Sequence, residues 1–217
     1  MVKKNKVVEK KDTAIDKNLK TYAPVVLGIG GFIIVVVVLL YFVSQGVGKV
    51  EYNGLTFIKE RYGEVVIYHY SYLTSMDNGN ARRVDLLLRG DPSENNVPVE
   101  GEIVYPLGKP VYLSINSSGL DECKYSTIAL AGFSGFIASN DIVLKAGTPD
   151  KEQSQKNNST YVTCENYPSN MVVSLKSGSE SKIERTSPYC YELEVANCEI
   201  LPVMEKFIVQ SVLDAKG

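Results

Sequence analysis

The residues of this chain whose type and spacing point most directly to chemistry are four cysteines. They are Cys123, Cys164, Cys190 and Cys198, and residues 1 to 122 contain none. No two of them form a C-x-x-C pair, the close spacing that redox motifs and zinc sites use. An even number of cysteines without that spacing favours structural disulfides in an oxidising compartment. We therefore predict two disulfides and no metal site.

The positions of the predicted strands and helices select one of the three pairings. Residues 191–196 alternate between apolar and polar types, as a half-buried strand does. An extended segment of that length holds Cys190 and Cys198 about 25 Å apart, whereas a disulfide needs Cα atoms within about 7 Å. If the two predicted helices begin at the same edge of the sheet, Cys123 and Cys198 meet there, and the up-down-up order of the last strands places Cys164 beside Cys190. We predict the disulfides Cys123–Cys198 and Cys164–Cys190.

The other candidates for catalysis are weak. His69 is the only histidine and lies in the run Tyr68 to Tyr72, where no serine, cysteine or aspartate is placed by the sequence to complete a triad. Residues 132–135 read G-F-S-G, which is one residue short of a nucleophile elbow and falls in a predicted helix. We interpret His69 as a sheet residue and the glycines as sites of close helix packing. No catalytic residue and no cofactor is predicted.

Three asparagines begin Asn-x-Ser/Thr triplets, the pattern of N-glycosylation acceptors: Asn116, Asn157 and Asn158. All three lie in the same part of the chain as the cysteines, so they are predicted glycosylation sites on an exported domain. The fourteen tyrosines, several of them between Tyr52 and Tyr72, suit either a recognition face or ordinary strand packing. We favour packing.

An uncharged run from Ala23 to Val43 has about the length that crosses a bilayer. Residues 1–22 carry seven lysines and three acidic residues, a net charge of +4, so the remainder of a chain whose total is -2 carries -6. The positive-inside rule then places the N-terminus in the cytoplasm and the large C-terminal part outside. A cleaved signal peptide is the alternative, but the apolar run is too long for one and no small-x-small cleavage site follows it. We predict a cell-membrane protein with one uncleaved span.

The elements that must position these residues form an α+β (mixed α/β) ectodomain on one N-terminal transmembrane helix. We expect a cytoplasmic Lys-rich tail at 1–21, the transmembrane helix at 22–44, a β-rich part at 45–108 and a disulfide-linked α/β part at 109–217. The Asn53-Gly54 turn and the alternating runs around it predict an antiparallel β meander. A β-α-β unit follows over 110–144, with a helix at about 122–138, then a loop from 146 to 160, a β hairpin over 171–185, a strand at 190–195 and a C-terminal helix.

Several stretches resemble a known kind of protein. They are YNGLTF at 52–57, RGDPSENNVPVEG at 89–101, YVTCEN at 161–166 and CYELEVANCEI at 190–200. These are similar to stretches of uncharacterised single-span, membrane-anchored surface proteins of small-genomed (DPANN-type) archaea. The resemblance implies an archaeal cell-surface protein and carries over no site residues.

From the residues themselves we expect a non-enzymatic domain that contacts the lipid bilayer through its anchor. Its expected partner is a cell-surface or envelope protein, which it binds or helps to assemble. The acidic C-terminal part argues against nucleic acid. The alternative is a cell-envelope hydrolase with its site near the β-α-β crevice, beyond the strand that ends at Ile115.

Overall fold

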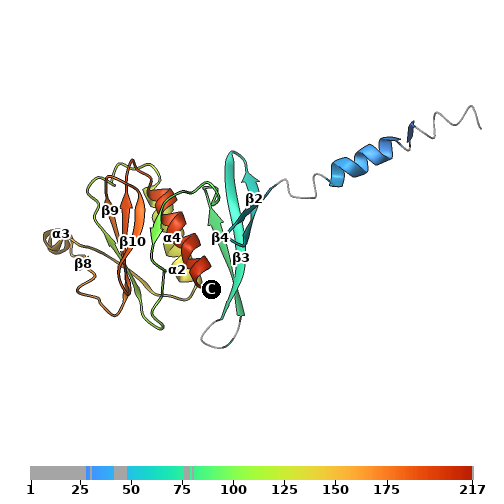
Figure 1. Cartoon of the computed structure of the whole chain (residues 1–217). Helices are drawn as coiled ribbons and strands as arrows, with labels where there is room; N and C mark the ends of the chain where they lie inside the picture. Colours follow the sequence, from blue (N-terminus) through green and yellow to red (C-terminus); the bar gives the residue numbers. More distant parts are fainter. Residues whose placement is uncertain (1–27, 30, 42–47, 76–78, 80, 217) are drawn as a thin grey trace, which may run out of the picture. The chain divides into compact units, whose positions relative to one another are not determined.

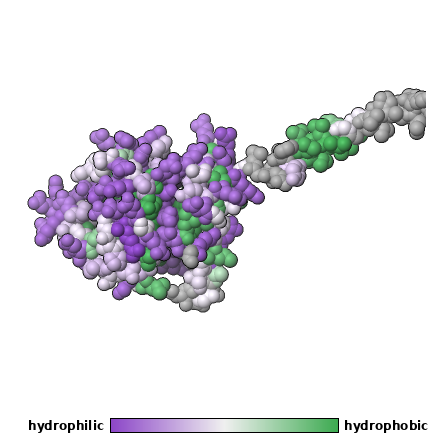
Figure 2. Space-filling view, viewed as in Figure 1, coloured by the Kyte–Doolittle hydropathy of each residue, from purple (hydrophilic) through white to green (hydrophobic). Residues whose placement is uncertain are grey.

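The computed structural model describes residues 28, 29, 31–41, 48–75, 79 and 81–216, and the chain divides into two compact units at residue 48. In the first unit, residues 28–29 and 31–41 are helical, and Figure 2 shows hydrophobic residues along this segment. Across the described residues, no helix combines the length and the apolar character that crossing a membrane needs. The rest of the predicted 22–44 span, like the predicted tail at 1–21, lies outside the described residues.

The second unit begins with the four-stranded antiparallel meander that the sequence predicts. Its strands are β1 (Lys49–Tyr52), β2 (Leu55–Tyr62), β3 (Val65–Ser75) and β4 (Ala81–Leu88), and they neighbour one another in chain order. Asn53 and Gly54 both have positive φ angles, 47° and 79°, as a two-residue turn of this type requires.

A seven-stranded sheet forms the other side of the unit. Its strands are β5 (Val99–Glu100), β6 (Val111–Ile115), β7 (Leu144–Thr148), β8 (Thr160–Tyr161), β9 (Met171–Ser177), β10 (Lys182–Ser187) and β11 (Cys190–Val195). The order is β5-β10-β11-β9-β6-β7-β8, with β7, β6, β9 and β11 in parallel. The expected hairpin of β9 with β10 is wrong, because β11 lies between them and pairs with both. Since β5 belongs to this sheet, the segments 45–108 and 109–217 share it.

Three helices are described in this unit: α2 (Ser126–Ser139), α3 (Lys151–Lys156) and α4 (Ile200–Asp214). The β6-α2-β7 segment is the expected parallel unit. Helix α3 falls in the stretch predicted to be a loop, and its signal is Asp150, whose side chain accepts hydrogen bonds from the N–H groups of Glu152 and Gln153. The predicted close helix packing at Gly132 and Gly135 is also wrong, because no atom comes within 4 Å of a Cβ placed on either residue.

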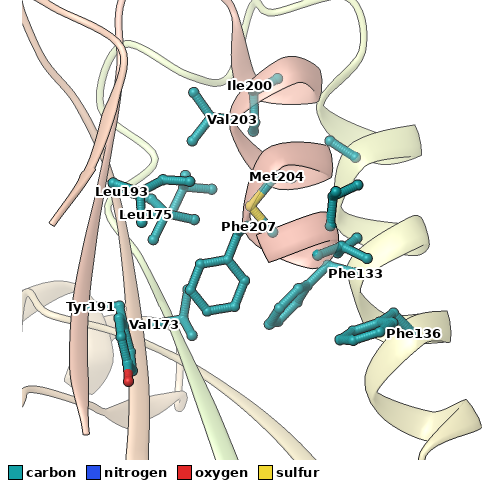
Figure 3. Close-up of a cluster of buried hydrophobic side chains, with 14 of the residues drawn as sticks. Phe133, Phe136, Val173, Leu175, Tyr191, Leu193, Ile200, Val203, Met204 and Phe207 are labelled. Atoms are coloured by element: carbon teal, nitrogen blue, oxygen red, sulfur yellow. The ribbon is translucent and has the colours of Figure 1, made fainter. Parts of the chain in front are cut away.

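The helices α2 and α4 lie between the two sheets and share one hydrophobic core with both (Figure 1). Phe207 of α4 makes edge-to-face contacts with Phe133 of α2 and with Tyr191 of β11 (Figure 3). On the other side, Phe57 and Leu88 of the meander join the same core. A helix between two sheets is buried on most of its surface, so a polar residue of α4 needs a partner inside the domain.

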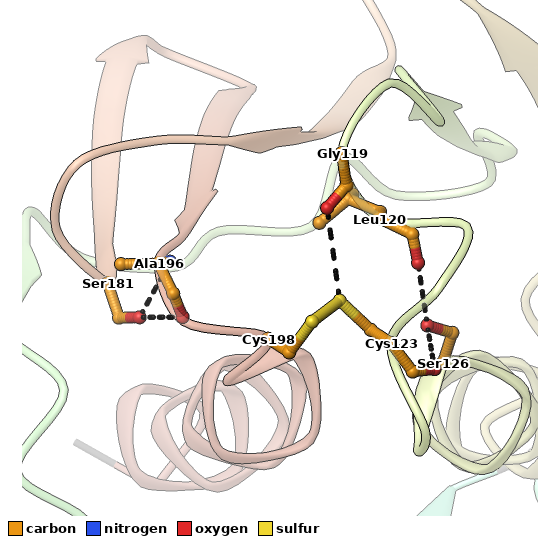
Figure 4. The surroundings of a disulfide bond; sticks show 7 residues. All are labelled: Gly119, Leu120, Cys123, Ser126, Ser181, Ala196 and Cys198. Atoms are coloured by element: carbon orange, nitrogen blue, oxygen red, sulfur yellow. Dashed lines mark hydrogen bonds between the residues drawn. A yellow bond between two sulfur atoms is a disulfide. The ribbon is translucent and has the colours of Figure 1, made fainter.

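Two disulfides lie at opposite ends of strand β11, and they are the predicted pairs. Cys123, just before α2, is joined to Cys198, just before α4, with a Cα–Cα distance of 5.2 Å (Figure 4). Cys164 is joined to Cys190 at the start of β11, with a Cα–Cα distance of 5.7 Å. The first pair fixes the starts of the two central helices relative to each other.

Candidate functional site

The side of the meander that faces away from α2 and α4 is the strongest candidate site. Successive side chains of a strand point to opposite faces, so Phe57, Tyr68 and Leu86 enter the core while their neighbours face outward. We call this outward side the outer face. Its centre holds Glu60, His69, Ser71, Arg83 and Asp85, and its most exposed apolar residues are Ile58, Tyr62, Leu73 and Leu87.

The strand register brings the central polar group together. Ile58, His69 and Leu87 stand opposite one another on three strands, and Ser71 stands opposite Asp85. His69 Nδ1 lies 3.0 Å from Glu60 Oε1, and its Nε2 lies 3.0 Å from Asp85 Oδ1. A carboxylate only accepts hydrogen bonds, so an imidazole between two of them donates from both nitrogens and is protonated.

Electrostatics agree with that protonation. The hydrogen bond to Glu60, followed by the one to Asp85, raises the pKa of His69 above its ordinary value of 6.5. Hydrogen bonds from Ser71, His69 and Arg83 hold the pKa of the Asp85 carboxyl well below its usual range. The pKa of Glu60 is also lowered, first by the Tyr62 hydroxyl, which donates to it at 2.6 Å, and then by His69. The outer face therefore carries a fixed network of charges.

This network does not have the chemistry of a catalytic triad, although it contains a serine, a histidine and two carboxylates. Ser71 Oγ lies 3.1 Å from His69 Nε2, but its proton goes to Asp85 Oδ1 at 2.6 Å. A protonated histidine has no lone pair with which to take a proton from the serine. His69 and Ser71 line neither of the two cavities described below. The sequence alone does not identify Glu60 and Asp85 as partners of His69, because they come from the neighbouring strands.

Exposed apolar side chains surround the charged centre. The exposed fractions are 50% for Ile58, 65% for Tyr62, 73% for Leu73 and 58% for Leu87. By contrast Tyr68, Tyr70 and Tyr72 point inward and pack against the core, so the tyrosine-rich strand serves packing, as favoured above. Several large exposed apolar side chains on one face are typical of a protein-binding surface.

The crevice expected for a hydrolase is a shallow cavity of about 260 Å³ beyond β6. Its lining consists of Ile115, Ser117, Ala146, Gly147, Thr148, Gln153, Asn157 and Ser159. No carboxylate, imidazole or amine is present among these described lining residues, so none of them can act as a general base at neutral pH. Asn157 belongs to it, and both Asn157 and Asn158 are exposed, whereas Asn116 is half-buried and its Oδ1 accepts the Ser118 N–H at 3.2 Å.

A cavity of about 690 Å³ lies at the start of α4 and was not expected from the sequence. Asp91, Glu94, Glu180, Glu199 and Glu205 contribute carboxylates to its lining. Glu205 is 7% exposed, and its carboxylate accepts hydrogen bonds from the backbone N–H groups of Arg89 at 2.5 Å and Gly90 at 3.0 Å. Burial raises the pKa of this carboxyl from 4.5 to about 7.

Glu205 thus holds the loop after β4 against helix α4 through these hydrogen bonds. Its sequence signal is a carboxylate four residues after Leu201 and three before Ile208, at positions where α4 otherwise places apolar side chains. No group of three or more His, Cys, Asp and Glu side chains in the described part of the chain is arranged to hold a metal ion. No protein-family model, curated protein or solved structure matches this chain.

Proposed function

We propose that the chain is a membrane-anchored extracytoplasmic domain that binds a protein partner of the cell envelope through its outer face. The observation that carries the proposal is the exposure of Ile58, Tyr62, Leu73 and Leu87 around the fixed charges of His69 and its partners. Burial of such side chains supplies binding free energy, about 25 cal/mol per Å² of apolar surface. The charges at the centre select a partner of complementary pattern.

The anchor and the exterior location rest on the sequence. The uncharged run from Ala23 to Val43 follows a segment of net charge +4, which favours a cytoplasmic N-terminus. Two disulfides in the domain fit an oxidising compartment. The crevice beyond Ile115 offers no comparable support for a hydrolase, because its lining lacks an acid–base group.

The test compares variants of the full chain in the membrane where it is native. Ile58→Asp places a charge in the middle of the outer face, and Leu107→Asp places the same charge at a 98% exposed apolar residue outside the meander. After gentle detergent extraction and chemical crosslinking, mass spectrometry identifies what is joined to each protein. We expect one recurrent envelope protein with the wild type and with Leu107→Asp, and its loss with Ile58→Asp. Recovery of the wild-type chain alone, or of the same partner with both variants, would show that the outer face is not the binding site.

A further inference from the structure

The free edge of β4 is an exception among the sheet edges of this domain. The seven-stranded sheet ends in β5 and β8, which have two residues each, and β1 at the other end of the meander has four. β4 has eight residues and carries Leu86, Leu87 and Leu88, and no described strand pairs with its far side. Short edge strands protect a sheet against association, and a long apolar edge invites it.

The exposed side of α2 borders the same edge. Its residues there are Ile128, Ala131, Gly132, Gly135 and Ala138, and α2 carries no charged residue along its whole length. A groove of about 350 Å³ lies between this helix face and the end of β4. Polar residues normally cover the solvent side of a helix, so a small, uncharged side is suited to contact with another surface.

We propose that a second copy of this chain occupies this edge, so that β4 pairs antiparallel with β4 of the second copy. A two-fold axis perpendicular to the sheet would join the two meanders into one sheet of eight strands. This axis keeps the outer faces of both copies on the same side of the joined sheet. Residues that stand opposite each other across the new edge then point to the same face. The uncharged sides of the two α2 helices face each other beneath the joined edge. The glycines at 132 and 135 permit a close approach of their backbones.

The charges of β4 select one register for this pairing. If the two-fold axis passes through Val84, residues 81 to 87 of the two copies pair. Arg83 of each copy then stands opposite Asp85 of the other, on the outer face. Centred on Arg83, two arginines stand opposite each other, and centred on Asp85, two aspartates do. Opposite charges across strands stabilise a pairing and like charges oppose it. Within one chain Arg83 Nε donates to Asp85 Oδ1 at 2.9 Å, and the two side chains are 62% and 48% exposed, so in this register each guanidinium would lie near the Asp85 carboxylates of both copies.

An extended segment of a different protein is the competing occupant, since any strand can add to a free edge. It lacks the two-fold charge match, which relates Arg83 and Asp85 of this chain to each other. Self-association is a separate claim from the proposed envelope partner, because its main contacts are the backbone edge of β4 and the exposed side of α2; it shares only Arg83 and Asp85 with the outer face. If the occupant is a second copy, the purified chain has the mass of a dimer; if it is a different protein, the purified chain has the mass of a monomer.

The experiment measures the protein mass of the purified full chain in detergent by light scattering over a series of concentrations. We expect the wild type to reach twice the 23.9 kDa of one chain. Gly132→Glu adds a carboxylate to the α2 contact and should weaken association at least about 100-fold, because the charge is buried without a partner. Arg83→Asp places like charges opposite each other twice and should weaken it about tenfold.

Matched controls keep the test specific. Gln155→Glu introduces the same charge on α3, and Arg61→Asp makes the same substitution on β2, at exposed residues away from the edge. Both controls should form the wild-type dimer, and circular dichroism checks that all four variants fold. A wild type that stays monomeric at every concentration refutes the proposal. So does a dimer that Gly132→Glu leaves unchanged, and a dimer insensitive to Arg83→Asp refutes the register on which the choice of occupant rests.

Discussion

Replacing Glu205 by glutamine should change how the stability of the domain depends on pH. Glu205 lies between α4 and the loop after β4, where burial raises the pKa of its carboxyl from 4.5 to about 7. At pH values below 4.5 the carboxyl is neutral in both the folded and the unfolded chain. As the pH rises above 4.5 the unfolded chain loses this proton first, so the free energy of unfolding falls until the folded carboxyl also ionises near pH 7.

The difference between the two pKa values sets the size of the effect. At 1.36 kcal/mol per pH unit, it amounts to about 3 kcal/mol of stability lost between pH 4.5 and pH 7, with a plateau above that. Glutamine is neutral at every pH and keeps one carbonyl oxygen for the two backbone N–H groups. Its missing second acceptor lowers stability by about 1 kcal/mol at all pH values.

The assay is urea unfolding of the full chain and of Glu205→Gln in the same detergent, followed by circular dichroism at several pH values. Measuring both proteins in the same buffers cancels the other titrating groups, including His69. The free energy of unfolding of the wild type relative to Glu205→Gln should fall by about 3 kcal/mol between pH 4.5 and pH 8. A difference that stays constant over this range would mean that burial does not raise the pKa of Glu205, and the reasoning would fail.

Three further predictions follow from the same structure. Removing the Cys123–Cys198 disulfide, which has a sequence separation of 75, should lower the free energy of unfolding by about 4.5 kcal/mol. Removing Cys164–Cys190, with a separation of 26, should lower it by about 3.5 kcal/mol. Equal losses in urea unfolding would contradict the loop-length argument. Gly147→Ala should lower stability by about 1 to 3 kcal/mol, because its Cβ would overlap the Thr160 carbonyl. Gly132→Ala lies in open space within a helix and should raise stability by about 0.5 to 1 kcal/mol. Thermal unfolding of the two variants compares these effects. Mass spectrometry of membrane-extracted protein should give the uncleaved chain, and loss of the first ~45 residues would overturn the anchor.

Local signals in the sequence determined the meander and the β6-α2-β7 unit. The Asn53-Gly54 turn acts over a few residues, and hydrophobic periodicity distinguishes α2 from its flanking strands. The turn and the periodicity are fixed by residues close together in the chain, so a single sequence reveals them. The pairing of Cys123 with Cys198 needed in addition the assumption that the two helices begin at the same edge of the sheet.

Only the tertiary structure decided which distant segments meet. The position of β11 between β9 and β10 depends on which edge each strand joins, and no local pattern specifies that. The contacts of His69 with Glu60 and Asp85 depend on the register of three strands. Glu205 needs a partner only because α4 is enclosed by two sheets, and the far edge of β4 has no partner among the described strands because the meander ends there. Each of these depends on long-range packing, which a single sequence encodes only through the whole fold.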